Sequence, residues 1–309
     1  MKVLVSGANG FIGRALCSHF SSLGHSVVPA VRRSCGMKGE HIVGDKLSWM
    51  HALAGCSSVV HLAGRAHVTQ DHEPDPLQAF RAANVDTTIE LANRVVEAGV
   101  RRFVYLSSIK VNGEFTEAGQ PFTADNDPAP EDPYGVSKHE AEQSLRQIAD
   151  ETGMEVVIIR PPLVYGPGVK ANFGSMMRWL MRGVPLPLAA VTKNRRSLVA
   201  LDNLIDLIVT CLNHPAAANQ TFLVSDGEDL STADLLKRMG FALGHPARLF
   251  YMPPSILKLG AQVVNRPGIY QRLCGSLQLD IAKTQQMLGW TPPVSVDEGL
   301  RRAAEGFRA

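Results

Sequence analysis

The chain has 309 residues, of which 45% are apolar and 19% charged, and its formal net charge at pH 7 is +2. This length can bury a full core, either as one large α/β domain or as one domain with a smaller lobe. So small a net charge gives no reason to expect a nucleic acid or an acidic membrane as a partner. We expect no metal site, because the ten histidines include no H-E-x-x-H spacing.

The cysteines and the hydropathy of the sequence indicate the cellular compartment in which the protein is expected. The five cysteines are scattered without a C-x-x-C pair, which suits a reducing environment. The sequence shows no basic leader with an apolar segment and no run of about 18 apolar residues. We therefore expect a cytoplasmic protein without a membrane span.

Short runs of β-branched residues alternate with helical patterns through the first two thirds of the chain. Nearly continuous Val, Ile and Leu predict buried strands over residues 2–7, 25–31, 57–64, 101–108, 154–162 and 220–226. Apolar residues at a spacing of three to four predict helices over residues 11–24, 84–100, 134–153 and 202–215. Asp202 is the expected cap of the last of these. The alternation implies a parallel sheet with helices on both faces.

Three glycines follow the first predicted strand at intervals of three residues, in the sequence GANGFIG. Gly7, Gly10 and Gly13 stand directly before a predicted helix. Glycines in this place allow a tight turn, the close approach of a pyrophosphate and close packing of strand against helix, while the helix N-terminus offers free N–H groups. The pattern predicts a dinucleotide site, and a tight turn without a ligand is the alternative.

The second predicted strand ends where dinucleotide-binding folds often place an acidic residue against the adenosine ribose. Val31 stands near this place, and Arg32 and Arg33 follow it. Because guanidinium groups pair well with a 2′-phosphate and no carboxylate is present to repel it, the pair favours NADP(H). Two solvated surface arginines are the alternative. Asp45, after another short strand, could accept a hydrogen bond from the adenine amino group or could cap a helix.

The chemistry is expected from the fourth strand and the helix that contains YGVSK. Tyr134 and Lys138 are four residues apart, so both side chains lie on one face of a helix. A phenol has an ordinary pKa of about 10. A neighbouring ammonium would lower that pKa, so that Tyr134 could give or take the proton of an alcohol during hydride transfer. Ser107 and Ser108 end the preceding strand, where a hydroxyl could bind a substrate carbonyl oxygen or only form a turn.

The composition changes after residue 165. Residues 166–194 are rich in Gly, Pro, Met and Leu, and from Ser231 onward helical patterns and proline-bounded loops prevail. We therefore expect a dinucleotide-binding domain over residues 1–165, to which residues 195–226 return. A smaller, mostly helical lobe is expected from residues 166–194 and 227–309.

The order of the motifs resembles the extended short-chain dehydrogenase/reductase superfamily, in its nucleotide-sugar epimerase/dehydratase branch. The motifs are GANGFIG, GD, HLAG, NV, LSSIKVNG, YGVSK and RPPLVYGPG, and they span nearly the whole chain. The resemblance implies an α/β fold with a Rossmann-type doubly wound parallel sheet, a smaller C-terminal substrate lobe and an NAD(P)(H) cofactor. It also implies a homodimer through the helices near residues 84–98 and 134–151. Ser108, Tyr134 and Lys138 would be the catalytic residues.

The resemblance further implies which residues bind the ligands. Together with Gly13, Arg32 and Arg33, the residues expected at the cofactor are Gly7, Gly10, Phe11, Ile12, Asp45, Ala63, Asn84, Tyr134, Lys138 and Pro161. The residues expected at a nucleoside diphosphate sugar are Ser108, Lys110, Asn172, Arg196 and Arg272. Guanidinium groups suit a diphosphate, although Arg195 and Arg196 could also be a solvated pair.

Departures from the family pattern concern the sugar end of the site. Lys110 and Asn112 stand where many relatives have small residues and a tyrosine, and Ala200 stands where a histidine is frequent. The segments SSIKVNGE, VKANF and LVSDGEDLST are most similar to bacterial UDP-sugar 4-reductases of O-antigen (lipopolysaccharide) synthesis. This similarity implies reduction of UDP-2-acetamido-2,6-dideoxy-xylo-hexos-4-ulose to UDP-N-acetylquinovosamine. The alternatives are a 4-epimerase of UDP-glucose or UDP-N-acetylglucosamine with tightly bound NAD+, and a non-catalytic dinucleotide-sensing protein.

Overall fold

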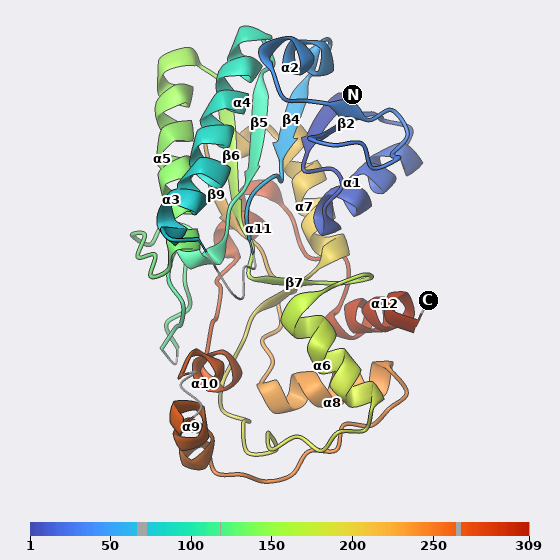
Figure 1. The fold of residues 1–309 in the computed structure, drawn as a ribbon, viewed down its shortest axis with the longest axis vertical. Helices are drawn as coiled ribbons and strands as arrows, with labels where there is room; N and C mark the ends of the chain where they lie inside the picture. Colours follow the sequence, from blue (N-terminus) through green and yellow to red (C-terminus); the bar gives the residue numbers. More distant parts are fainter. Residues whose placement is uncertain (67–72, 118, 264–266, 309) are drawn as a thin grey trace.

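The computed structural model describes residues 1–66, 73–117, 119–263 and 267–308. Within these ranges, a parallel sheet has the strand order β3-β2-β1-β4-β5-β6-β9 (Figure 1). Its strands are β1 (Lys2–Ser6), β2 (Ser26–Val31), β3 (His41–Ile42), β4 (Ser58–His61), β5 (Arg102–Leu106), β6 (Glu155–Arg160) and β9 (Thr221–Leu223). The predicted strands and the doubly wound parallel sheet are thereby confirmed.

Helices cover both faces of the sheet, and the apolar contacts show which helices lie on which face. The helices α1 (Phe11–Ser22) and α7 (Leu201–Asn213) share one buried cluster with the sheet. The helices α2 (Lys46–Leu53), α4 (Thr87–Glu97) and α5 (Pro133–Thr152) share the other. The expected cap at Asp202 is wrong, because α7 begins one residue earlier: Ala200 is its N-cap and Asp202 lies in its first turn.

Two short irregular helices lead into the region where the chemistry is expected. The helix α3 (Pro76–Arg81) continues into a π-helical turn, η1 (Ala82–Asp86), before α4 begins. A 3₁₀ turn, η2 (Ile109–Val111), follows β5. Single π turns inside α-helices are frequent at functional sites, and this one contains Asn84.

Most of the remaining elements lie below the sheet in the view of Figure 1, whereas α11 lies beside the sheet and contacts β9. Here β7 (Leu163–Tyr165) pairs in parallel with β8 (Leu198–Ala200). The helices α6 (Ala171–Met181), α8 (Thr232–Ala242) and α12 (Val296–Arg308) contribute to a further apolar cluster, while α9 (Pro254–Val263) and α10 (Pro267–Cys274) contact each other. The turn η3 (Pro215–Ala217) and the helix α11 (Ala282–Leu288) lie next to each other.

Part of the C-terminal segment packs against the main sheet. Leu277, Leu279, Ile281, Leu288 and Trp290 belong to the same buried cluster as α1 and α7. The boundaries at residues 165, 194 and 226 stay a prediction.

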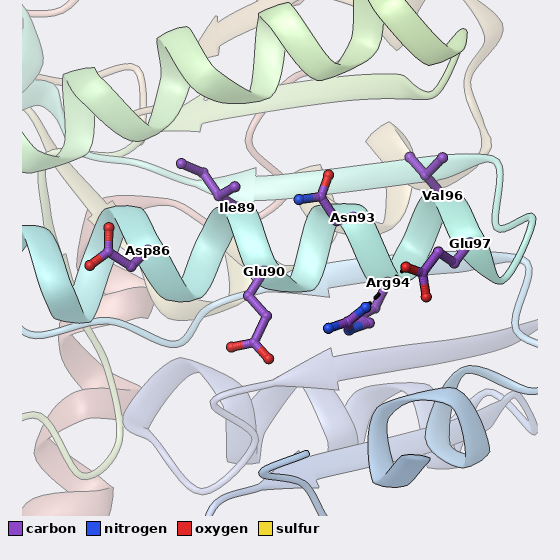
Figure 2. A pocket seen from close by; sticks show the side chains of 7 residues that line it. All are labelled: Asp86, Ile89, Glu90, Asn93, Arg94, Val96 and Glu97. Atoms are coloured by element: carbon purple, nitrogen blue, oxygen red, sulfur yellow. Dashed lines mark hydrogen bonds and ion pairs between the residues drawn. The ribbon is translucent and has the colours of Figure 1, made fainter. Parts of the chain in front are cut away.

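A groove of about 620 Å³ runs along the exposed side of α4. Figure 2 shows the side chains that line it: Asp86, Ile89, Glu90, Asn93, Arg94, Val96 and Glu97. Arg94 and Glu97 form an ion pair within this helix at 2.9 Å, and Glu97 also pairs with Lys46 of α2 at 3.0 Å.

The homodimer that the resemblance implies would use this helix, and it stays a prediction. A measurement of the molecular mass in solution by light scattering would test it.

Two further observations concern cysteines and membrane spans. All five cysteines lie in the described ranges and are free thiols. Among the helices of the described residues, none combines the length and the apolar character that crossing a bilayer requires.

Candidate functional site

Several of the expected site residues directly follow strands at the carboxyl edge of the sheet, near the point where the strand order reverses between β1 and β4. Gly7 follows β1, Ala63 follows β4, Ser108 follows β5 and Pro161 follows β6. Ligands of open α/β sheets bind at such a switch point, because the loops of neighbouring strands diverge there. The topology therefore places the motifs in one region although up to 150 residues separate them in the chain.

The glycine turn is shaped by packing at two of its positions. Gly7 has a φ of +69°, and a Cβ atom there would lie 2.7 Å from the backbone nitrogen of Ala63. A Cβ atom at Gly13 would overlap the carbonyl oxygen of Gly7. These two glycines are therefore required by the turn itself and by its contact with β4.

The third glycine bears on the ligand. Gly10 is exposed and is the N-cap of α1, but no side chain hydrogen-bonds to the first N–H groups of this helix. Phe11 and Ile12 form the first helical turn and are only partly buried. A helix N-terminus with free N–H groups and no side chain in front of it suits a pyrophosphate. The residues present thus fit a dinucleotide.

Arg32 and Arg33 follow β2 and are exposed, and within the described residues neither forms an ion pair. Glu40, a carboxylate in the same loop, forms its hydrogen bonds within the loop and not with these arginines. It accepts hydrogen bonds from the backbone N–H groups of Cys35 at 3.1 Å and Met37 at 3.0 Å, and these bonds together with the Ser34 hydroxyl lower the pKa of Glu40 to about 2.

Asp45 forms a capping box at the start of α2. Its Oδ1 accepts from the backbone N–H of Ser48 at 2.8 Å, and the Ser48 hydroxyl oxygen accepts from the backbone N–H of Asp45 at 3.1 Å. The bonds to Ser48 lower the pKa of Asp45. The helix-cap interpretation is confirmed, and the contact of Asp45 with adenine stays a prediction.

Tyr134 and Ser108 lie together. The Ser108 hydroxyl lies close enough to the phenol to act on its pKa, and Ser108 Oγ accepts from the backbone N–H of Lys110 at 3.3 Å. Burial of the hydroxyl raises the pKa of Tyr134 to about 12, and Ser108 only partly offsets this by lowering the pKa. The side chain as a whole is partly exposed. The phenol is therefore protonated at neutral pH.

Lys138 differs from its expected arrangement. Its buried ammonium donates to the carbonyl oxygen of Leu106 at 2.9 Å and to the hydroxyl of Tyr105 at 3.2 Å. Burial lowers the pKa of Lys138 to about 8. The expectation that Lys138 lowers the pKa of Tyr134 is not met. The ammonium donates to Tyr105 and Leu106 of β5, and burial of the phenol is the largest effect on the pKa of Tyr134.

Asn84 connects the π turn to the site. Its Oδ1 accepts from the backbone N–H of Arg65 at 2.7 Å, and its Nδ2 donates to Arg65 O at 3.1 Å and to Ser137 Oγ at 2.9 Å. A Cβ atom at Gly64 would lie 2.9 Å from Asn84 Oδ1 and 3.5 Å from Lys138 Nζ. The loop after β4, the π turn and Lys138 therefore meet, as expected for one cofactor site.

Two of the residues that depart from the family pattern take part in internal contacts. Lys110 Nζ pairs with Glu114 at 2.6 Å and with Asp132 at 2.5 Å. Asn112 is buried and accepts from Arg160 at 2.9 Å while donating to the carbonyl oxygen of Thr123 at 2.9 Å. Lys110 is thus neutralised at the mouth of the site, and Asn112 supports the loop after β5.

The other predicted substrate residues lie on separate elements. Asn172 is exposed in the first turn of α6, and Arg272 is exposed in the last turn of α10. Arg196 is partly buried and donates to the carbonyl oxygen of Gly275 at 3.1 Å, which ties it to the segment after Arg272. Among the described residues, no hydrogen bond joins the three predicted side chains to one another, and their contact with a diphosphate stays a prediction.

Several buried polar residues around the site were not predicted from the sequence. They are His61, Thr88 and Tyr105 beside Lys138, and the pair of Glu142 and Arg160. His61 lies within the HLAG motif, so its position was visible, but strand periodicity only marks it as buried.

Comparisons with known proteins agree with this geometry. The family model described as "NAD dependent epimerase/dehydratase family" matches residues 3–225. The chain is 44% identical over 312 residues to a UDP-glucose 4-epimerase of Vibrio cholerae, covering 99% of this chain and 95% of the relative. It is 28% identical over 212 residues to a UDP-2-acetamido-2,6-beta-L-arabino-hexul-4-ose reductase of Pseudomonas aeruginosa, covering 68% of this chain and 48% of the relative.

A solved structure agrees over the full length. MoeE5 in complex with UDP-glucuronic acid and NAD is 27% identical to this chain and superposes with a TM-score of 0.77, covering 100% of this chain and 99% of MoeE5. The family match covers well over half of the chain. The protein therefore belongs to the NAD dependent epimerase/dehydratase family.

Proposed function

We propose that the protein is a UDP-hexose 4-epimerase that uses NAD+. The observation that carries this proposal is the 44% identity to a UDP-glucose 4-epimerase over 99% of the chain. It favours the epimerase alternative over the 4-reductase that the sequence motifs suggested. The Ser108, Tyr134 and Lys138 group supports either reaction, because both need a proton moved at the same alcohol oxygen.

In this proposal the chain holds the reacting groups in place. The amides at the start of α1 bind the pyrophosphate, and Asn84 and Lys138 border the nicotinamide ribose. The bound dinucleotide supplies a hydride acceptor and donor at sugar C4. The oxidation half of the cycle requires Tyr134 as the phenolate, so the positive charge of the bound cofactor would have to lower the pKa of Tyr134 from its value of about 12. The phenolate then takes the proton from the O4 hydroxyl, and the resulting phenol returns it after the 4-keto sugar has rotated, while Ser108 hydrogen-bonds to the same oxygen.

The chemistry at Lys110 favours an uncharged sugar. Its ammonium is already paired with two carboxylates, Glu114 and Asp132. A uronic acid would therefore meet a neutralised cation and an excess of carboxylate beside Ser108, so we propose a neutral hexose as substrate.

The experiment that tests the function uses purified protein and UDP-galactose without added cofactor. We expect UDP-glucose to form, and heat denaturation of the protein to release about one NAD+ per chain, because an epimerase regenerates its cofactor in each cycle. Protein that carries no cofactor and instead consumes NADH or NADPH with a UDP-4-keto sugar would contradict the proposal.

The second candidate is reduction of a UDP-4-keto sugar, which the exposed arginine pair favours. Arg32 and Arg33 have no ion-pair partner within the described residues and could hold the 2′-phosphate of an exchanging NADPH. If they do, Arg32→Ala with Arg33→Ala should raise the KM for NADPH by about tenfold or more and change the KM for NADH by less than twofold. Lys38→Ala in the same loop is the control. Equal effects on both cofactors would show that the pair is only solvated surface.

A further inference from the structure

A chain of buried polar side chains connects Lys138 to the start of the glycine turn. Lys138 Nζ donates to the Tyr105 hydroxyl at 3.2 Å, and the Thr88 hydroxyl lies close enough to that of Tyr105 to act on its pKa. His61 Nε2 lies 2.9 Å from Thr88 Oγ1, and His61 Nδ1 lies 2.5 Å from Ser6 Oγ. The five side chains come from five different elements, α5, β5, α4, β4 and β1, and each is less than 5% exposed.

The partners of Thr88 fix the direction of every hydrogen bond in this chain. The Thr88 hydroxyl donates to the carbonyl oxygen of Asn84 at 2.6 Å, so its oxygen faces its two other neighbours, His61 and Tyr105, only as an acceptor. His61 must then carry its proton on Nε2 and accept from Ser6 at Nδ1. Burial and the nearby ammonium of Lys138 lower the pKa of His61 to about 3, so its ring is neutral.

This arrangement leaves Lys138 with one donor to spare. An ammonium has three N–H groups, and Tyr105 and Leu106 accept from two of them. We propose that Tyr105, Thr88 and His61 are positioning residues, which hold Lys138 charged and aim its remaining N–H at the reacting groups. The inference rests on the proposed function, in which Lys138 serves the ribose and Tyr134.

The surroundings make the hydroxyl of Tyr105 important for the charge of Lys138. The titratable groups around the ammonium are His61 on β4, Tyr105 on β5 with Tyr134 of α5 acting on it, and Glu142 on α5. The first three are neutral near pH 7, since burial raises the pKa of both phenols and lowers that of the imidazole. The carboxylate of Glu142 is shared with Arg160 of β6. Neutral acceptors therefore carry much of the stabilisation of this ammonium.

The test is Tyr105→Phe, which removes one acceptor and keeps the ring. Because the ammonium form of Lys138 donates to that acceptor more strongly than the neutral amine does, the pKa of Lys138 should fall below its present value of about 8. We expect the alkaline limb of the kcat profile to move down by about one pH unit. This shift corresponds to a loss of kcat of about fivefold at pH 8, and the KM for the sugar should stay within about twofold. Tyr165→Phe, which loses a buried hydroxyl bonded to Asp226, is the matched control and should not move the limb.

A second readout does not depend on turnover. In protein labelled with ¹³C-lysine, the Cε resonance that is missing from Lys138→Met reports the titration of Lys138. We expect this titration to move to lower pH in Tyr105→Phe and in Thr88→Val, and to stay in place in Thr88→Ser, which keeps the hydroxyl. An unchanged titration in Tyr105→Phe would overturn the inference, whereas absent epimerase activity with a shifted titration would overturn only the proposed function.

Discussion

Tyr134→Phe should lower kcat by about 1,000-fold or more, because it removes the group that moves the proton at O4. The pKa of Tyr134 is about 12, so the wild-type phenol is a protonated donor at neutral pH, and the phenylalanine ring offers no proton. Cofactor binding should be kept, since the glycine turn and Asn84 are untouched. Turnover of UDP-galactose with the retained NAD+ measured in parallel checks both points.

The control for this substitution is Tyr251→Phe, which also loses a phenol hydroxyl, from a side chain that is 73% exposed. It should leave kcat within about twofold, because it touches neither Ser108 nor Lys138. If Tyr134→Phe retained more than a tenth of the wild-type rate, another group would have to be the proton carrier.

Glu142→Leu should lower the free energy of unfolding by about 3–5 kcal/mol, as expected when one partner of a buried ion pair is removed. Glu142 Oε2 pairs with Arg160 Nη2 at 2.5 Å, and the two side chains are 2% and 4% exposed. The substitution leaves the guanidinium of Arg160 buried with only Asn112 as a remaining side-chain acceptor among the described residues. Urea unfolding followed by circular dichroism measures the loss.

The double variant Glu142→Leu with Arg160→Met separates the pair from the packing around it. Replacing both partners by apolar side chains removes the unpaired charge, so most of the lost stability should return. Glu298→Gln, which weakens an exposed cluster with Arg301 and Arg302 on α12, should leave unfolding nearly unchanged. A single variant as stable as the wild type would show that water reaches Arg160.

The main sheet could be predicted because its strands are continuous apolar runs with clear turn residues between them. The strands β7 and β8 were not predicted, since each has only three residues and β7 follows β6 after two prolines without a change of composition. The cap of α7 was placed two residues too late, at Asp202 and not at Ala200, because an acidic residue in the first turn resembles an N-cap in sequence. Local patterns fix the elements better than their ends.

The motifs indicated which residues to expect near the site, but they did not predict the hydrogen-bond partners or the pKa shifts of these residues. The distance in sequence is 33 residues between Lys138 and Tyr105 and 55 residues between His61 and Ser6. Such contacts depend on the strand order and on burial, neither of which a motif contains. Burial also reversed the expected direction for Tyr134, whose pKa is raised and not lowered.

The central claim is that the dinucleotide bound at this site takes a hydride from sugar C4 and gives it back while Tyr134 moves the proton. The most direct test uses UDP-galactose carrying deuterium at C4, incubated in ordinary water with no added cofactor. The account predicts UDP-glucose that retains the deuterium at C4. Product with hydrogen from water at that carbon, or no product from protein that carries NAD+, would contradict it.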